Sequence, residues 1–150
     1  MSIHQLKLKI ITPERTVLEE AVDSVTIPTT LGEIGIFPQH IPLVAAVASG
    51  DIVAKKDGED IPMAVSGGFV EVRRGADGSA TEVAVLADFA EHVAEISEEA
   101  AEKARARAAE LMQMKHNAED VNFEHFAAEL ERSLTRAKIA DKWRGKKYRM

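Results

Sequence analysis

The sequence predicts an all-β plus α fold, in which an antiparallel β-sandwich over residues 1–90 precedes an antiparallel two-helix hairpin over residues 91–150. Apolar residues recur with a period of two from about residue 3 to residue 87, and in Leu6–Ile10 they alternate with lysine. Beyond about residue 90 the chain is rich in alanine and glutamate, and the period changes to 3.6. This change divides the chain into a sandwich domain and a hairpin that ends in a basic tail.

Short segments rich in β-branched and aromatic residues recur through the first half, separated by turn signals. Asp57-Gly58 and Asp77-Gly78 are typical of hairpin turns, because both turn positions need a positive φ. Many short strands at this spacing indicate an antiparallel sandwich or barrel. After Leu6–Ile10, the expected strands are Thr16–Leu18, Ser24–Ile27, Leu43–Val47, Ile52–Ala54, Met63–Val65, Phe69–Val72 and Val83–Leu86.

Residues 32–40 predict a presented loop. Gly32 and Gly35 bracket two residues, which is typical of a tight turn rather than of a strand interior. Pro38 fixes the path by which the chain leaves this turn and withholds a backbone donor. We therefore expect Glu33 and His40 to project together from one rigid loop.

Two amphipathic helices are expected after the sandwich. Ser97 is a suitable N-cap, and acidic residues follow it in the first turn. After a break at residues 116–120, Asn122 is expected to cap the second helix, with Val121 and Phe126 as a hydrophobic staple. The expected apolar stripes are Ala100, Ala101, Ala104, Ala108 and Leu111, then Phe123, Phe126, Ala127, Leu130, Leu134 and Ala137. A stripe made mostly of alanine buries little apolar area, so the hairpin is expected to be held weakly and to be displaceable.

Composition excludes several classes of protein. The 150 residues contain no cysteine, which rules out disulfides and thiolate zinc sites. No secretory or transit signal is evident, and no apolar run approaches the roughly 20 residues of a membrane span, so any membrane association is expected to come through a partner. The net charge is −6, yet the last ten residues hold five bases and one acid. Positive charge confined to a tail argues against nucleic-acid binding and favours a local acidic target.

The sequence carries no enzyme signature. Ser66-Gly67-Gly68 lacks the pattern of a nucleophile elbow, and residues 32–35 lack the lysine and helix of a phosphate-binding loop. The five histidines show no ligand spacing typical of zinc sites. We therefore expect no catalytic residue, no metal and no cofactor.

Three segments nevertheless resemble a known family. Gly32–His40 is similar to the hallmark loop of the epsilon subunit of F-type ATP synthases, and Ser66–Val72 and Val83–Asp88 resemble two further blocks in the same order. The resemblance implies a flattened N-terminal sandwich and a non-catalytic place in the central rotor stalk. It further implies a bacterial protein on the cytoplasmic face of the membrane, peripheral to it, in a complex that makes ATP from ADP and phosphate with an ion gradient. The partners implied are the gamma subunit, the c-ring and the α and β subunits.

The resemblance assigns roles to individual residues. Gly32, Glu33, Gly35 and His40 would lie at the base of the sandwich, facing the c-ring and gamma. The hairpin would restrain ATP hydrolysis by extending into the α3β3 head.

Some family members bind ATP on the hairpin, and here that site is incomplete. Ser97 and Ala100 stand where the motif has an aspartate and an arginine, although Arg107, Arg132 and Arg136 fall on its basic positions. We expect ATP binding to be weak or absent, and a solvated helix face remains the alternative for these arginines.

The basic tail would meet acidic segments of the β subunits inside the head. Its cations are expected to be solvated while the hairpin is compact, so the tail would favour the extended, inhibited state. A frayed, solvated terminus is the alternative. The tail bases are Lys142, Arg144, Lys146, Lys147 and Arg149.

Two other classes of protein stay open from sequence alone. A stand-alone small β-sandwich enzyme would need a convergent polar pocket with perturbed titrating groups. A soluble ATP-sensing protein would need the aspartate and arginine that the hairpin motif lacks.

Overall fold

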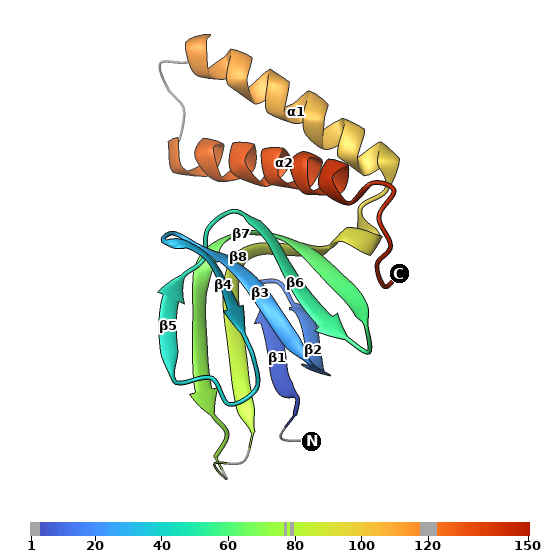
Figure 1. Cartoon of the computed structure of the whole chain (residues 1–150). Helices are drawn as coiled ribbons and strands as arrows, with labels where there is room; N and C mark the ends of the chain where they lie inside the picture. The colour runs from blue at the N-terminus through green and yellow to red at the C-terminus, as the bar shows by residue number, and fades with distance from the viewer. Residues whose placement is uncertain (1–3, 77, 79, 118–122) are drawn as a thin grey trace.

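The computed structural model describes residues 4–76, 78, 80–117 and 123–150 (Figure 1). Within these residues the strands form a sandwich, and the two helices lie antiparallel across one end of it, with the second helix nearer the strands. The expected sandwich followed by a helical hairpin is therefore confirmed. The strands are β1 (Leu6–Ile11), β2 (Thr16–Val22), β3 (Ser24–Thr29), β4 (Gly32–Ile36), β5 (Leu43–Ala46), β6 (Gly50–Lys56), β7 (Glu59–Arg74) and β8 (Thr81–His92).

Two long strands connect both layers of the sandwich. β7 and β8 pair from Met63↔His92 to Arg74↔Thr81. One part of β7 pairs with β6, whereas a later part of the same strand pairs with β5. The strand order is β2-β1-β8-β7-β6-β3-β4, with β5 also on β7. One pair departs from the predicted antiparallel arrangement, because β1 runs parallel to the first half of β8.

The two segments predicted as separate strands on either side of Gly67 form the single strand β7. Gly67 and Gly68 both have positive φ and lie between the part of β7 that pairs with β6 and the part that pairs with β5. Glycine permits this backbone conformation within a continuous strand. The two glycines therefore do not separate two strands; they mark the corner at which the single strand β7 changes its pairing partner from β6 to β5.

The main core fills the space between the layers. Its buried side chains are aliphatic and come from nearly every strand, as the period of two predicted. Asp57 and Gly58 both have positive φ between β6 and β7, so the predicted hairpin turn is confirmed there. Asp77 of the second predicted turn lies outside the described residues.

The prediction of a tight turn at residues 32–35 is wrong. These residues belong to β4, which pairs antiparallel with β3 and ends the strand order. Ile36 is fully buried and Ile34 packs against the core, so burial of these isoleucines places the segment in the sheet. Gly35 pairs with Thr26 there, and glycine is tolerated in such an edge strand.

The first helix, α1 (Glu98–Asn117), follows the short 3₁₀ helix η1 (Val93–Glu95). The Ala100 amide donates to Ser97 Oγ at 3.0 Å, which confirms the predicted N-cap. The expected stripe of α1 is largely buried, at Ala101, Ala104, Ala108 and Leu111.

The second helix, α2 (Phe123–Trp143), buries Phe126 and Ala137 of the predicted stripe, but its buried face also includes residues outside that stripe. Leu134 is 45% exposed, whereas Ile139 and Trp143 are buried against Ala64 and Val93 of the sandwich region. The prediction considered packing on α1 alone, but α2 also contacts β6 and β7. The expected cap and staple residues Asn122 and Val121 lie outside the described residues. Within the described part of the chain, neither helix is long and apolar enough to span a membrane.

Candidate functional site

The structure separates the two residues expected to share one loop. Glu33 is an exposed residue near the start of β4, beside the β3–β4 turn, whereas His40 follows the other end of the strand (Figure 1). His40 is half-buried, and its Nδ1 donates to the Ile41 carbonyl at 2.6 Å. The Gln39 amide donates to Thr81 Oγ1 at 2.6 Å, which ties this loop to β8. The two side chains therefore form two surfaces and not one acid–imidazole pair.

Each of these two ends exposes large apolar side chains. Leu31 in the β3–β4 turn is 99% exposed, and Phe37 and Ile41 in the β4–β5 loop are 64% and 72% exposed. Exposed apolar groups at adjoining positions are typical of surfaces that another protein covers.

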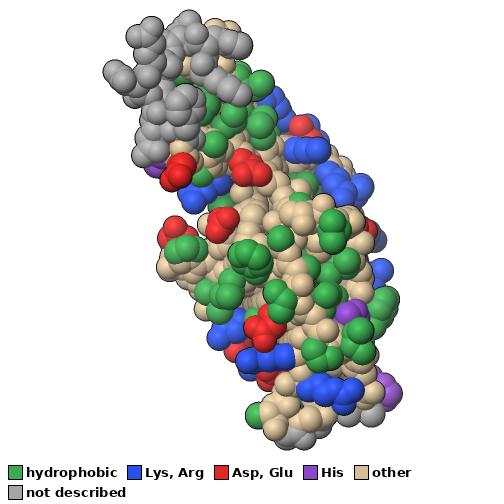
Figure 2. Space-filling model, turned by 90° about the vertical axis from the view of Figure 1, so that its left-hand side faces the viewer, with side chains coloured by type: hydrophobic (Ala, Val, Ile, Leu, Met, Phe, Trp, Pro, Cys, Tyr) green, Lys and Arg blue, Asp and Glu red, His purple; other side chains and the backbone are tan. Residues whose placement is uncertain are grey.

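A third apolar surface lies on the strands. Val44 of β5, Phe69 of β7 and Leu86 of β8 are all more than half exposed. Phe69 and Leu86 are directly paired across the two strands, so their side chains lie on the same face. Figure 2 shows the side of the molecule on which β5 lies, where hydrophobic side chains gather over the sandwich.

Gly32→Ala is expected to cost about 1 kcal/mol of the free energy of unfolding, because Gly32 has φ +118° and an added Cβ would meet nothing within 4 Å. The cost is therefore one of backbone conformation alone. Gly35→Ala is the matched control, since its φ is not positive and its nearest contact is Phe37 Cε2 at 3.6 Å. Denaturant unfolding of the two variants measures the difference, and equal midpoints would contradict the expected strain at Gly32.

The three arginines expected near a nucleotide do not converge. Arg107 of α1 pairs with Glu110 at 3.2 Å and with Glu129 of α2 at 2.7 Å. The hydrogen bond from Arg107 lowers the pKa of Glu129, and the pKa of Arg107 is raised in turn. Arg107 therefore joins the two helices.

Arg132 and Arg136 of α2 lie together on the sandwich side. Their guanidinium carbons are 5.9 and 5.3 Å from the Phe89 ring centroid, within cation–π range. Arg136 also pairs with Glu91 at 2.8 Å. Both arginines line a polar pocket of about 250 Å³ with Thr12, Glu14, Arg15, Asp88, Phe89, Ala90 and Glu91.

The expectation that the tail cations are solvated in the compact state is wrong for Lys142, Arg144 and Arg149, which pair with acidic side chains elsewhere in the chain. Lys142 pairs with Asp51 at 2.8 Å, and Arg144 pairs with Glu98 at 3.1 Å. Lys146 Nζ lies 5.4 Å from the Trp143 ring centroid. These contacts hold the tail against the molecule itself, and the expectation failed because it considered only the tail's own sequence.

Arg149 makes a bidentate contact with the sandwich. Its guanidinium donates to both carboxylate oxygens of Glu20 on β2, at 2.6 and 2.7 Å. Lys56 donates to the same carboxylate at 2.9 Å. The hydrogen bonds from Arg149, followed by those from Lys56, lower the pKa of Glu20 to about 2 against the opposing effect of burial.

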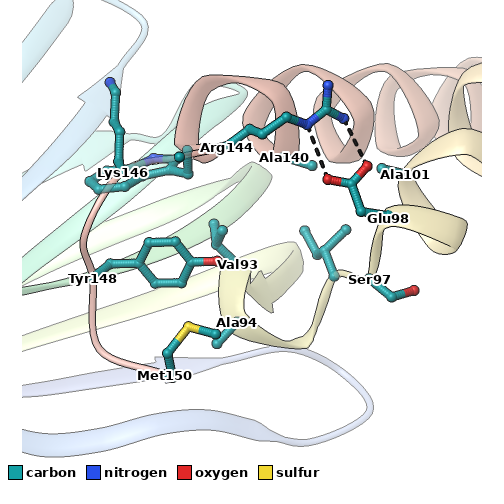
Figure 3. Close-up of a pocket in the computed structure, with 13 residues that line it drawn as sticks. Val93, Ala94, Ser97, Glu98, Ala101, Ala140, Arg144, Lys146, Tyr148 and Met150 are labelled. Carbon is teal, nitrogen blue, oxygen red and sulfur yellow. Dashed lines mark hydrogen bonds and ion pairs between the residues drawn. The ribbon is translucent and has the colours of Figure 1, made fainter.

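The tail closes a pocket of about 400 Å³ between η1, the start of α1 and the end of α2 (Figure 3). Arg144 reaches Glu98 across one side of this pocket, and Tyr148 points across it toward Val93. Ser97, expected at the nucleotide motif, also lines it. The pocket is thus built partly from the tail.

Sequence reasoning missed the sandwich residues that receive the tail. Neither Asp51 nor Glu20 belongs to a functional motif. Their partners are 91 to 129 positions away along the chain. The single tryptophan so near a basic terminus was the one available signal, because a Trp seldom stays exposed without a partner.

Comparison with known proteins gives consistent similarities. Residues 5–93 match the family described as "ATP synthase, Delta/Epsilon chain, beta-sandwich domain". The "ATP synthase epsilon chain" of Herpetosiphon aurantiacus is 38% identical over 135 residues, which cover 90% of this chain and 93% of the relative. The protein of the same name from Dehalococcoides mccartyi is 41% identical over 140 residues, covering 93% and 95%.

A solved structure shows a similar arrangement of the backbone. A chain in the mitochondrial ATP synthase of Euglena gracilis, a structure described as containing OSCP, F1 and the c-ring, aligns with a TM-score of 0.59 at 27% identity. The alignment covers 87% of this chain and 79% of that one.

Proposed function

Because the chain belongs to the ATP synthase delta/epsilon family, we propose that it is a central-stalk subunit that couples gamma to the c-ring and restrains ATP hydrolysis through its helical hairpin. As a member of this family it is a non-catalytic subunit of an ATP synthase, and the complex as a whole makes ATP. The observation that carries the proposal is the similarity to epsilon chains over nine-tenths of the sequence, hairpin included.

The exposed apolar surfaces support a subunit that is covered on several sides. We assign contact with the c-ring and gamma to the two ends of β4, where Gly32, Glu33, Gly35 and His40 lie near exposed Leu31 and Phe37. The paired Phe69 and Leu86 on the strand face offer a further surface to gamma. Exposed apolar surfaces of this kind would let partner subunits bind a rotor subunit firmly on more than one side.

The hairpin is the regulatory part of the proposal. Its bases Lys142, Arg144, Lys146, Lys147 and Arg149 would meet acidic β-subunit segments after the hairpin extends. Lys142, Arg144 and Arg149 must first leave the ion pairs that they make in the compact state. We place the complex at the cytoplasmic face of a bacterial membrane, with this subunit attached only through its partners, in the path of proton-coupled ATP synthesis. ATP itself is expected to bind the isolated chain weakly or not at all, because Arg107 is held by Glu129 away from Arg132 and Arg136.

A chain ending at Glu95 is expected to support ATP synthesis while ATP hydrolysis rises above that of the full chain. The cut follows β8 and η1, and the main core lies wholly within the retained residues. It falls beyond the predicted boundary at residue 90, because β8 continues to His92. Membranes lacking the endogenous subunit would be complemented with each form, and hydrolysis, proton pumping and co-purification with gamma would be measured.

The full chain in the same membranes is the control for this truncation. Failure of either form to co-purify with gamma and the c-ring would refute the place in the stalk. Equal hydrolysis rates with normal co-purification would refute only the restraint by the hairpin.

A further inference from the structure

We propose that residues 142–149 form a clasp that locks the helical hairpin onto the sandwich and must open before the hairpin can move away. The clasp is anchored at two separate places on the sandwich, Asp51 and Glu20. It goes beyond the proposed function, because it gives the tail a role inside this chain in the absence of any partner.

The first anchor is the carboxylate of Asp51 on β6, whose side chain is only 9% exposed. Lys142 Nζ lies 3.0 Å from Oδ1 and 2.8 Å from Oδ2, and Trp143 Nε1 donates to Oδ2 at 2.8 Å. Hydrogen bonds to an ionised group are stronger than neutral ones, and burial strengthens them further. Asp51 thus holds the last turn of α2.

Trp143 adds apolar contact to this anchor. Its side chain is 7% exposed and packs with Ile139 against Ala64 and Val93, in a cluster separate from the main core. Movement of the hairpin would expose this cluster and leave the main core intact. The polar anchor and the apolar cluster therefore open together.

The chain then reverses direction toward the strands. Gly145 has φ +77°, and the Lys146 amide donates to the Trp143 carbonyl at 3.1 Å, which forms a turn. Tyr148 packs edge-on against Trp143 with ring centroids 5.8 Å apart. The turn directs Tyr148 and Arg149 back onto the molecule, and the contacts of these two residues stabilise the reversed path of the tail.

The second anchor lies at the far end of the tail. The Arg149 amide donates to the Asp60 carbonyl at 2.8 Å, and its guanidinium binds both oxygens of Glu20. The Glu20 side chain is 21% exposed and the Arg149 side chain 38%, so this pair is only partly shielded from solvent. A bidentate arginine–carboxylate contact fixes both the distance between the two side chains and their relative orientation.

Two anchors on one short segment act cooperatively. When one opens, the other keeps the tail at a high effective concentration beside it, so the first closes again. Opening both is needed for release. This arrangement gives the tail a compact-state role that opposes its proposed inhibitory one, and variants on the sandwich side can separate the two because they leave every tail cation in place.

The test uses the full isolated chain with Asp51→Asn, Glu20→Gln and the double variant, with Glu82→Gln as control. Glu82 pairs with Arg73 on the strands and does not contact the tail. Trp143 is the only tryptophan, so its fluorescence reports directly on the first anchor. Amide hydrogen exchange of residues 143–149 reports on the whole clasp.

Each single variant is expected to speed amide exchange in the tail about tenfold, as expected for loss of one charge-assisted contact. The double variant is expected to shift Trp143 emission to the red and to speed tail exchange further, while the β7 amides still exchange far more slowly than the tail amides. Unchanged emission and exchange in the double variant would overturn the clasp. Should Asp51→Asn disturb the sandwich, Arg149→Gln tests the second anchor from the tail side, and unchanged tail exchange there would overturn it equally.

In the assembled complex, the double variant is expected to lower ATP hydrolysis, because a hairpin released with all its cations is free to inhibit. This last result rests on the proposed function. Faster tail exchange in the isolated chain without an effect on hydrolysis would leave the clasp standing and refute the regulatory role of the hairpin.

Discussion

Gly68→Ala is expected to lower the free energy of unfolding by about 3 kcal/mol or more. An added Cβ at Gly68 would lie 2.1 Å from the Leu86 carbonyl oxygen and 2.8 Å from the Ala87 Cα. Both atoms belong to the backbone of β8, so relief requires β7 and β8 to separate at the corner. The positive φ of +113° adds a conformational cost for any residue other than glycine.

Gly58→Ala is the matched control for Gly68→Ala. Gly58 also has positive φ, at +79°, but an added Cβ there meets nothing within 4 Å. Only the backbone cost of about 1 kcal/mol applies. Denaturant unfolding followed by circular dichroism compares the two, and a shared midpoint would show that the corner tolerates a methyl group.

Glu20→Gln is expected to destabilise the chain by up to about 3 kcal/mol at neutral pH, from a pKa lowered from 4.5 to about 2. Because the folded pKa lies below the unfolded one, the stabilisation is fully present above about pH 4.5. The stabilisation is lost as the pH falls toward 2. Below about pH 4.5 Glu20 is protonated in the unfolded chain, and near pH 2 it becomes protonated in the folded chain as well. The difference in free energy of unfolding between the unaltered chain and Glu20→Gln should therefore shrink across this range.

The neighbouring Glu19 supplies a control for the Glu20 prediction. Glu19 pairs with Lys7 at 3.4 Å, and both side chains are more than 40% exposed, so Glu19→Gln should change stability by less than about 1 kcal/mol. Unfolding curves at several pH values measure both variants. A Glu20→Gln difference that stayed constant from pH 7 to pH 2 would show that charge plays no part in it.

Local signals in the sequence predicted local structure well. The alternation in Leu6–Ile10, the turn at Asp57-Gly58 and the cap at Ser97 each depend on residues within a few positions, and each is confirmed. The tight turn predicted from Gly32 and Gly35 was wrong because the prediction used the turn propensity of glycine and did not consider that Ile34 and Ile36 pack in the core. Tertiary packing overrides propensity in such cases.

The candidate sites depended on contacts that no local pattern contains. Arg149 and Glu20 are 129 positions apart, and nothing in either segment identifies the other. The parallel pairing of β1 with β8 is likewise a property of the whole topology. The family resemblance identified the class of protein, while the packing of its tail required the structure.

The strands β7 and β8 also determine how the sandwich responds to mechanical force. In a sandwich held together only by side-chain packing, a twisting load can make one sheet slide over the other. Here both layers share the continuous β7, which pairs with β6 and with β5 on either side of Gly67 and Gly68. Sliding would therefore strain covalent backbone and break the hydrogen bonds between β7 and β8, which gives the sandwich torsional stiffness.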